Sequence, residues 1–206
     1  MDVCFYYIHQ VARSWKNLKF VATTTNSLFH AKFKHMYPKF KDDANVIISS
    51  WILLSTSWVE VDLVFIPLLP ANKAHWKLRV LDIKAHTQRV LKSSTYNDIK
   101  VRIGIEPFVS MLSCLMKCVG IWKKDSIELN MDLDFSLPQQ KNGHDCGIYM
   151  VKYAEYMLYD NIGSMPMKFN AGRARLNVAS LLFQYQEIGK ARKTVRLTGG
   201  ESIFLE

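Results

Sequence analysis

The sequence has few of the residues that hold small domains together by covalent or metal cross-links. Its 206 residues include only four cysteines, which are Cys4, Cys114, Cys118 and Cys146. They show no C-x-x-C spacing and are matched by no histidine pair, so neither a disulfide framework nor a zinc finger is indicated. We therefore expect a protein of a reducing compartment, intracellular in the nucleus or the cytoplasm.

Long apolar segments are missing as well. The longest uncharged run, residues 45–59, contains several serines and threonines and is followed by Glu60 and Asp62. A membrane-spanning helix needs about 20 predominantly apolar residues. The first residues also lack the basic and apolar pattern of a secretory signal. No membrane association is expected.

The composition is that of an ordinary globular protein, with 49% hydrophobic and 22% charged residues. No repeat and no linker rich in Gly, Ser or Pro divides the chain, so we expect one domain over residues 1–206, acting as a monomer. The net charge of +9 favours acidic partners. Nucleic acid is not the expected partner, because the sequence has no run of five like charges and no stacked aromatic and basic motif.

The hydrophobic pattern predicts strands in the middle of the chain and helices around them. Alternating apolar residues predict strands at 59–66, 75–83 and 87–91, arranged as a meander, with Pro67 ending the first. In the second of these strands, Lys77 and Arg79 alternate with the apolar residues, which places them on its polar face. Three-and-four spacing predicts helices at 105–119, 147–159 and 173–188, the last ending at Gly189. The expected fold class is therefore α+β.

One cysteine is placed where catalysis would need it. Cys146 follows a polar turn that contains Gly143 and immediately precedes the predicted helix at 147–159. Backbone N–H groups at a helix N-terminus stabilise a thiolate, which makes Cys146 the best candidate nucleophile. A Cys/His enzyme also needs a base. His75 is the better candidate, because it opens a strand after a loop, whereas His144 is constrained by the same turn as Cys146.

Two other cysteines lie four residues apart on the predicted helix at 105–119. Cys114 and Cys118 would share one helical face, where they could meet a metal ion. Cysteines on helices are far more often core residues, so we expect these two to be buried.

Two ordered blocks resemble those of the ubiquitin-like-protein-specific (Ulp-type) cysteine peptidases, and VDLVFIP stands just upstream. The matching residues are His75, Trp76, Leu78, Val80, Asp82 and Lys84, then Gln140, Asn142, Gly143, Asp145, Cys146 and Gly147. The resemblance covers residues 59–188. In this region the chain is similar to divergent plant or transposon-derived members of the family. Residues 1–58 match little of the family and are divergent or truncated. The family implies a papain-like α+β fold, with a central, mostly antiparallel sheet flanked by helices.

The resemblance also implies roles for particular residues. Cys146 would be the nucleophile and His75 the general base. Gln140 would donate its side-chain N–H to the oxyanion, beside the backbone N–H of Cys146. Trp76 would wall a narrow channel that admits a Gly-Gly tail. Such thiol hydrolysis needs neither a cofactor nor a metal ion.

The sequence departs from the family at the third member of the triad. The family's aspartate stands about seventeen residues after the histidine, where this chain has Lys92. A lysine cannot orient the imidazole as an acid does, and its charge would oppose protonation of the ring. Asp82 is not expected to substitute, because an odd separation on one strand points it to the opposite face from His75. Asn97 or Asp98 would reach His75 only if residues 93–100 fold back.

The expected function is that of a cysteine-type peptidase. It would hydrolyse the peptide or isopeptide bond after the C-terminal Gly-Gly of a SUMO-like ubiquitin-like modifier. The alternative is a catalytically impaired pseudopeptidase that binds the modifier or another protein without cleavage. A basic nucleic-acid binder ranks last, because no motif supports it.

Overall fold

The computed structural model describes residues 2–14, 17–43, 58–68, 75–94, 98–134 and 136–198. The chain divides into two compact units, residues 1–168 and residues 169–206. The first unit contains the sheet and all of the candidate site residues. The expectation of a single domain over the whole chain stays a prediction.

The first unit is built on a five-stranded mixed sheet with strands in the order β1-β2-β3-β4-β5. Its centre is the predicted antiparallel meander of β2 (Leu63–Leu68), β3 (Lys77–Asp82) and β4 (Thr87–Leu91). Two strands that the sequence did not predict, β1 (Ala22–Thr24) and β5 (Asn130–Asp134), pair in parallel with β2 and β4. The sheet is thus antiparallel at its centre and parallel at both edges.

The first strand is shifted along the chain from its prediction. Residues Trp58–Glu60 form the short 3-10 helix η1, and Pro67 lies inside β2 rather than ending it. A proline lacks the N–H that a central strand needs. The edge strand β1 pairs only as far as Phe65, so Pro67 lies in the part of β2 that has one partner strand.

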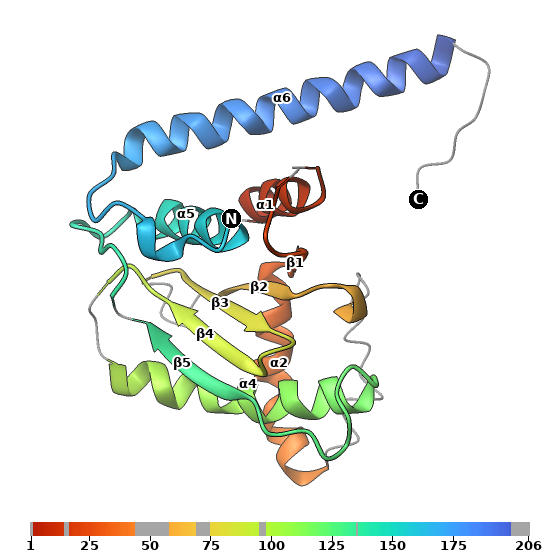
Figure 1. Ribbon diagram of the computed structural model, residues 1–206, viewed down its shortest axis with the longest axis vertical. Helices are drawn as coiled ribbons and strands as arrows, with labels where there is room; N and C mark the ends of the chain where they lie inside the picture. Colours follow the sequence, from red (N-terminus) through yellow and green to blue (C-terminus); the bar gives the residue numbers. More distant parts are fainter. Residues whose placement is uncertain are drawn as a thin grey trace. The chain divides into compact units, whose positions relative to one another are not determined.

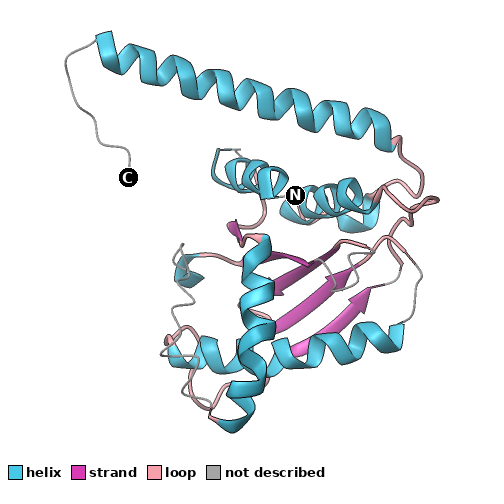
Figure 2. Ribbon diagram, turned by 180° about the vertical axis from the view of Figure 1, so that it is seen from behind, coloured by secondary structure: helices cyan, strands magenta, loops and turns pink. Residues whose placement is uncertain are grey.

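Helices cover both faces of the sheet (Figures 1 and 2). On one face, α1 (Asp2–Ser14) packs beside α5 (Cys146–Leu158), and α5 packs against β3. On the other face, α2 (Ser27–Asp42) packs against β2 and α4 (Asp98–Cys118). Within the described residues, no helix has the length and hydropathy to cross a membrane.

The helix predictions differ in accuracy. The helix predicted at 147–159 begins and ends one residue earlier, whereas α4 begins seven residues before the predicted Ile105. The sequence did not predict α1 or α2. Pro38 lies inside α2, and Asn26 caps this helix by accepting a hydrogen bond from the backbone N–H of Phe29 at 3.0 Å.

The main core lies between the sheet and the α2 and α4 helices. It contains Phe33, Ile66, Leu81 and Met111, all of them fully buried. The prediction that Arg79 lies on a polar face of its strand is wrong, because helices cover both faces and Arg79 is 0% exposed. Its guanidinium carbon lies 3.8 Å from the ring centroid of Phe108, and burial lowers the pKa of Arg79 to about 9.

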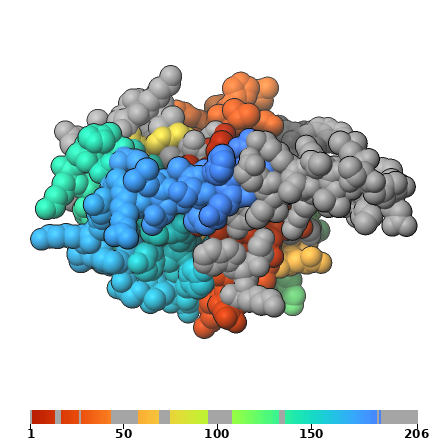
Figure 3. Space-filling view, turned by 90° about the horizontal axis from the view of Figure 1, so that it is seen from above, coloured from red at the N-terminus to blue at the C-terminus, as the bar shows by residue number. Residues whose placement is uncertain are grey.

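The second unit contains one long helix, α6 (Ala171–Thr198). Asn170 precedes the helix and accepts a hydrogen bond from the backbone N–H of Arg173 at 2.9 Å. The helix continues past Gly189, which was expected to end it. Most of its described side chains are exposed, including Leu176 and Phe183, and they form the blue surface in Figure 3.

Candidate active site

The candidate catalytic residues lie on segments that meet at one end of the sheet. His75 lies two residues before β3, and Lys92 lies one residue after β4. These strands are antiparallel, with Leu78 opposite Leu91, so the beginning of β3 and the end of β4 lie side by side. The backbone thus places His75 and Lys92 at the same end of the sheet, where the arrows of β4 and β5 end in Figure 1.

The loop that precedes Cys146 is hydrogen-bonded to this end of the sheet. The backbone N–H of Gln140 donates to the carbonyl of Ser93 at 2.8 Å. The side-chain amide of Gln139 donates to the carbonyl of Lys92 at 3.1 Å. Both acceptors belong to the segment that follows β4. Forty-seven residues separate the two segments in sequence, and these bonds join them directly.

The helix α5 holds the same loop from the other side. The hydroxyl of Tyr153 donates to the carbonyl of Pro138 at 2.6 Å and is 3.4 Å from the carbonyl of Lys92. The hydroxyl of Tyr149 donates to the carbonyl of Gln139 at 3.2 Å. Burial, and then the negative charge of Asp145, raises the pKa of Tyr149, so this phenol stays a donor at neutral pH.

Cys146 is the first residue of α5 and is buried, with 7% of its surface exposed. Asn142 organises the turn that leads to it. Its side-chain oxygen accepts hydrogen bonds from the backbone N–H groups of His144 and Asp145, at 3.1 and 3.0 Å, and its amide nitrogen donates to the Asp145 carboxylate at 2.7 Å. The Asn142 side chain therefore holds the turn that leads into α5, and Cys146 stands at the N-terminus of that helix, where the sequence analysis expected it.

The side-chain amide of Gln140 is held at both of its ends. The hydroxyl of Ser93 donates to its oxygen at 2.6 Å, and its nitrogen donates to the carbonyl of Asn142. A primary amide nitrogen carries two N–H donors, so one donor remains besides the bond to Asn142. The carbonyl of Asn142 can only accept, so it fixes which end of the amide is the nitrogen, and the bond from Ser93 holds the oxygen end.

His75 and Trp76 are both half-buried at the beginning of β3. The Nδ1 atom of His75 is buried and makes no hydrogen bond to any residue in the described part of the chain. Lys92, which the sequence analysis expects where the family has its aspartate, is buried with 3% of its surface exposed. Among the described side chains, therefore, no carboxylate bonds to Nδ1 of the candidate base.

Three residues, Asp82, Asn97 and Asp98, are the possible replacements for the triad acid. Asp82 is at the far end of β3 from His75, and its carboxylate accepts a hydrogen bond from the backbone N–H of Ala85 at 2.8 Å, which stabilises the turn to β4. As expected, it does not substitute for the acid beside His75. Asn97 lies outside the described residues, as does the side chain of Asp98.

Sequence reasoning assigned no role to three residues that build this site, although it named Asn142 among the residues that match the family. Hydrogen bonds from three side chains hold the loop before Cys146, and these side chains are Ser93, Asn142 and Tyr153. Asn142 carried a signal, because an asparagine side chain commonly accepts a hydrogen bond from the backbone N–H two residues on, as in an Asx turn. The other two bonds depend on how distant segments come together, which periodicity does not reveal.

Comparisons with known proteins identify the family of this chain. The family model described as "Ulp1 protease family, C-terminal catalytic domain" matches residues 7–185. Ubiquitin-like-specific protease 1 of Saccharomyces cerevisiae is 33% identical over 92 residues, covering 44% of this chain and 14% of the relative. Sentrin-specific protease 2 of Mus musculus is 25% identical over 142 residues, covering 64% of this chain and 22% of the relative. The chain thus spans less than a quarter of the length of these relatives.

Solved structures show the same fold. The C-terminal Ulp1 protease domain, crystallised in complex with Smt3, the yeast ortholog of SUMO, superposes with a TM-score of 0.62 at 22% identity. The superposition covers 88% of this chain and 75% of that domain. A structure described as a de-sumoylating protease gives a TM-score of 0.55 at 16% identity, covering 93% of this chain and 82% of that one. By its family match and its fold, this chain belongs to the Ulp1 protease family and comprises its C-terminal catalytic domain.

Proposed function

We propose that this protein is a cysteine peptidase that cleaves the peptide or isopeptide bond after the C-terminal Gly-Gly of a SUMO-like modifier. The observation that carries the proposal is the bonding of Gln139 and Gln140 to the end of β4, beside the start of β3. This bonding brings the loop of the candidate nucleophile to the segment of the candidate base. Family membership and the names of the relatives supply the substrate class.

In the proposed reaction, Cys146 gives its proton to His75, and its sulfur attacks the carbonyl carbon of the terminal glycine. The carbonyl oxygen becomes an oxyanion, held by the backbone N–H of Cys146 and the second N–H of Gln140. His75 then protonates the leaving amine, which leaves a thioester on Cys146. Water, deprotonated by His75, hydrolyses the thioester and releases the modifier. Trp76 would line the channel that admits the Gly-Gly tail.

We also propose that the protein acts inside the cell, in the nucleus or the cytoplasm, as a monomer. The four cysteines are free, which suits a reducing compartment. The proposed mechanism requires Cys146 in its thiol form, so an oxidising compartment would work against it.

A second candidate is favoured by the environment of His75. An imidazole with no carboxylate at Nδ1 is neither held in the right tautomer nor stabilised as imidazolium. Buried Lys92 replaces the family's acid. The same fold would then bind a ubiquitin-like modifier without cleaving it efficiently.

A SUMO vinyl-sulfone probe separates the two candidates. For a peptidase, we expect a covalent adduct on Cys146 that Cys146→Ala abolishes and that the control Cys118→Ser retains. Binding of unmodified SUMO without any adduct would establish the second candidate instead. If neither an adduct nor SUMO binding is found, the proposed substrate class is wrong.

A further inference from the structure

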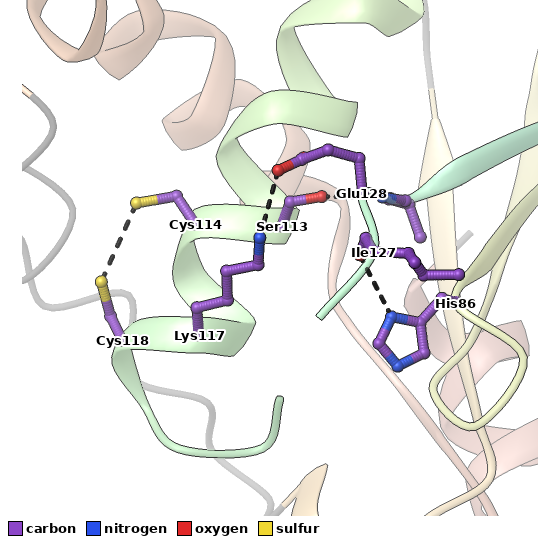
Figure 4. A network of polar contacts seen from close by, with 8 residues as sticks. His86, Ser113, Cys114, Lys117, Cys118, Ile127 and Glu128 are labelled. Carbon is purple, nitrogen blue, oxygen red and sulfur yellow. Dashed lines mark hydrogen bonds and ion pairs between the residues drawn. The ribbon is translucent and has the colours of Figure 1, made fainter. Parts of the chain in front are cut away.

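A second group of thiols lies on α4, which covers the opposite face of the sheet from α5. The sulfur atoms of Cys114 and Cys118 are 3.8 Å apart and point toward one another (Figure 4). Cys114 is half-buried and Cys118 is exposed. The expectation that both cysteines are core residues is therefore wrong for Cys118, and the proposed peptidase mechanism uses neither of them.

The two thiols line a cavity of about 490 Å³ at the C-terminal end of α4. Lys117, Lys124, Glu128 and two serines complete its lining. The ammonium of Lys117 is 3.1 Å from the Glu128 carboxylate, and this ion pair spans the cavity wall from α4 to the segment before β5 (Figure 4). A ligand in this cavity would meet both sulfurs from the solvent side.

The spacing of the sulfurs fits joint coordination of one metal ion. Two thiolates bound at about 2.3 Å in a tetrahedral site lie about 3.8 Å apart, which matches the observed distance. A disulfide fits poorly. It needs Cβ atoms about 3.5 to 4.5 Å apart, whereas residues four apart on a helix hold theirs at about 5 to 6 Å. The helix would have to distort to form the disulfide, but not to bind a metal ion.

We propose that Cys114 and Cys118 form a two-thiolate binding site for a soft divalent cation of the class of Zn²⁺ and Cd²⁺. Soft thiolate ligands select such ions over Mg²⁺ and Ca²⁺. On binding, each thiol releases its proton to solvent and each sulfur forms one bond to the ion. Within the described ranges, no group of three or more His, Cys, Asp or Glu side chains is placed to hold a metal. Water therefore completes the coordination.

The number of protein ligands sets the strength of this site. Two cysteines supply one thiolate each, whereas a structural zinc site has four protein ligands. We therefore expect weaker binding than at a site with four protein ligands.

Binding would cross-link the last turn of α4. The same helix buries Met111, Leu112, Leu115 and Met116 in the main core. The unfolded chain does not hold the two thiols at this spacing, so the ion binds mainly the folded state and raises its stability. Thermal stability thus provides a readout of the site that is independent of peptidase activity.

The test is a Cd²⁺ titration of the full chain carrying Cys146→Ala, which removes the candidate nucleophile as a competing thiol. We expect a sulfur-to-cadmium charge-transfer band that saturates at one ion per chain, together with a rise in Tm. Adding Cys118→Ser should remove the band, weaken binding at least tenfold and abolish the rise in Tm. Cys118 is exposed, so this change should not impair folding.

Cys4→Ser in the same background is the matched control and should leave the titration unchanged. Mg²⁺ should produce neither the band nor the rise in Tm. If the Cys118→Ser chain binds Cd²⁺ as tightly as its parent, or if Cys4→Ser removes the band instead, the proposal is wrong. Because no step uses peptidase activity, either result is independent of the proposed function.

Discussion

The hydroxyl of Ser93 donates a hydrogen bond of 2.6 Å to the side-chain oxygen of Gln140. Ser93 is buried, with 2% of its surface exposed, and the backbone carbonyl of the same residue accepts from the N–H of Gln140. Ser93 thus bonds both the backbone N–H and the side-chain oxygen of Gln140, the proposed oxyanion donor. Ser93 is therefore a positioning residue that acts through Gln140.

Ser93→Ala should lower kcat with little change in KM. A hydrogen bond of this kind contributes about 0.5 to 1.5 kcal/mol, which corresponds to a rate loss of up to about tenfold. Ser94→Ala, at the next residue, should leave kcat unchanged. In a Gln140→Ala background, Ser93→Ala should have no further effect on kcat. An additional loss there would show that Ser93 does not act through Gln140.

Lys92→Asp should accelerate formation of the SUMO vinyl-sulfone adduct on Cys146. In a serine protease, exchanging the triad acid for its amide lowers kcat about 10⁴-fold, so even a poorly placed carboxylate should give at least about a tenfold gain. Lys92→Met removes the charge but supplies no acid, and is the control. Equal adduct rates for the two variants would show that an acid at residue 92 does not reach His75. Circular dichroism would confirm that both variants fold.

Asn142→Ala should slow the reaction of Cys146 by loosening the turn before α5. The asparagine side chain makes three hydrogen bonds within this turn, each of which contributes about 1 kcal/mol or less at an exposed position. We expect a fall of about tenfold in the adduct rate and faster hydrogen exchange at residues 143–146. The neighbouring Lys141→Ala serves as the control. Unchanged exchange in Asn142→Ala would contradict this account of the turn.

The stability of the fold should fall as the pH drops below about 6.5. His30 stacks on Phe108, with ring centroids 4.7 Å apart, and its pKa is lowered to about 3 by burial, then by the charges of Arg79 and Lys34. Between pH 6.5 and 3 the unfolded chain takes up a proton that the folded chain does not, so protonation favours unfolding. The slope is at most about 1.4 kcal/mol per pH unit.

Urea denaturation at pH 7 and pH 5 would measure this contribution. His30→Phe should reduce the loss of unfolding free energy between the two values, because it removes the titrating ring and keeps an aromatic contact with Phe108. His35→Phe, at an exposed position of the same helix, should lose as much unfolding free energy between pH 7 and pH 5 as the parent does. A loss that is the same in all three chains would show that His30 is not responsible.

The sequence predicted the centre of the fold better than its edges. The strand at 87–91 and the helix beginning near Cys146 carry strong local patterns and are found within one residue of their predicted bounds. The edge strands β1 and β5 are short, and they form only because β2 and β4 offer them a pairing partner. Arg79 was misplaced because alternation shows that a side chain points to one face, but not whether a helix covers that face.

The candidate site was predicted in part. The placement of Cys146 at a helix N-terminus followed from local residue patterns, and the structure has it there. The catalytic roles of His75, Cys146 and Gln140, and the channel role of Trp76, stay predictions. The bonds from Ser93, Gln139 and Tyr153 join segments far apart in the chain, and no local pattern encodes them.

The hydroxyl of Tyr153 bonds the loop before Cys146 and lies near the end of β4. The position of the proposed reactive centre therefore depends on the packing of α5 and the sheet. On warming, catalytic competence and tertiary structure should disappear together, as a single cooperative event. Inactivation and melting curves of this protein should then coincide, and a temperature range with an intact sheet but a disassembled thiol site should not exist.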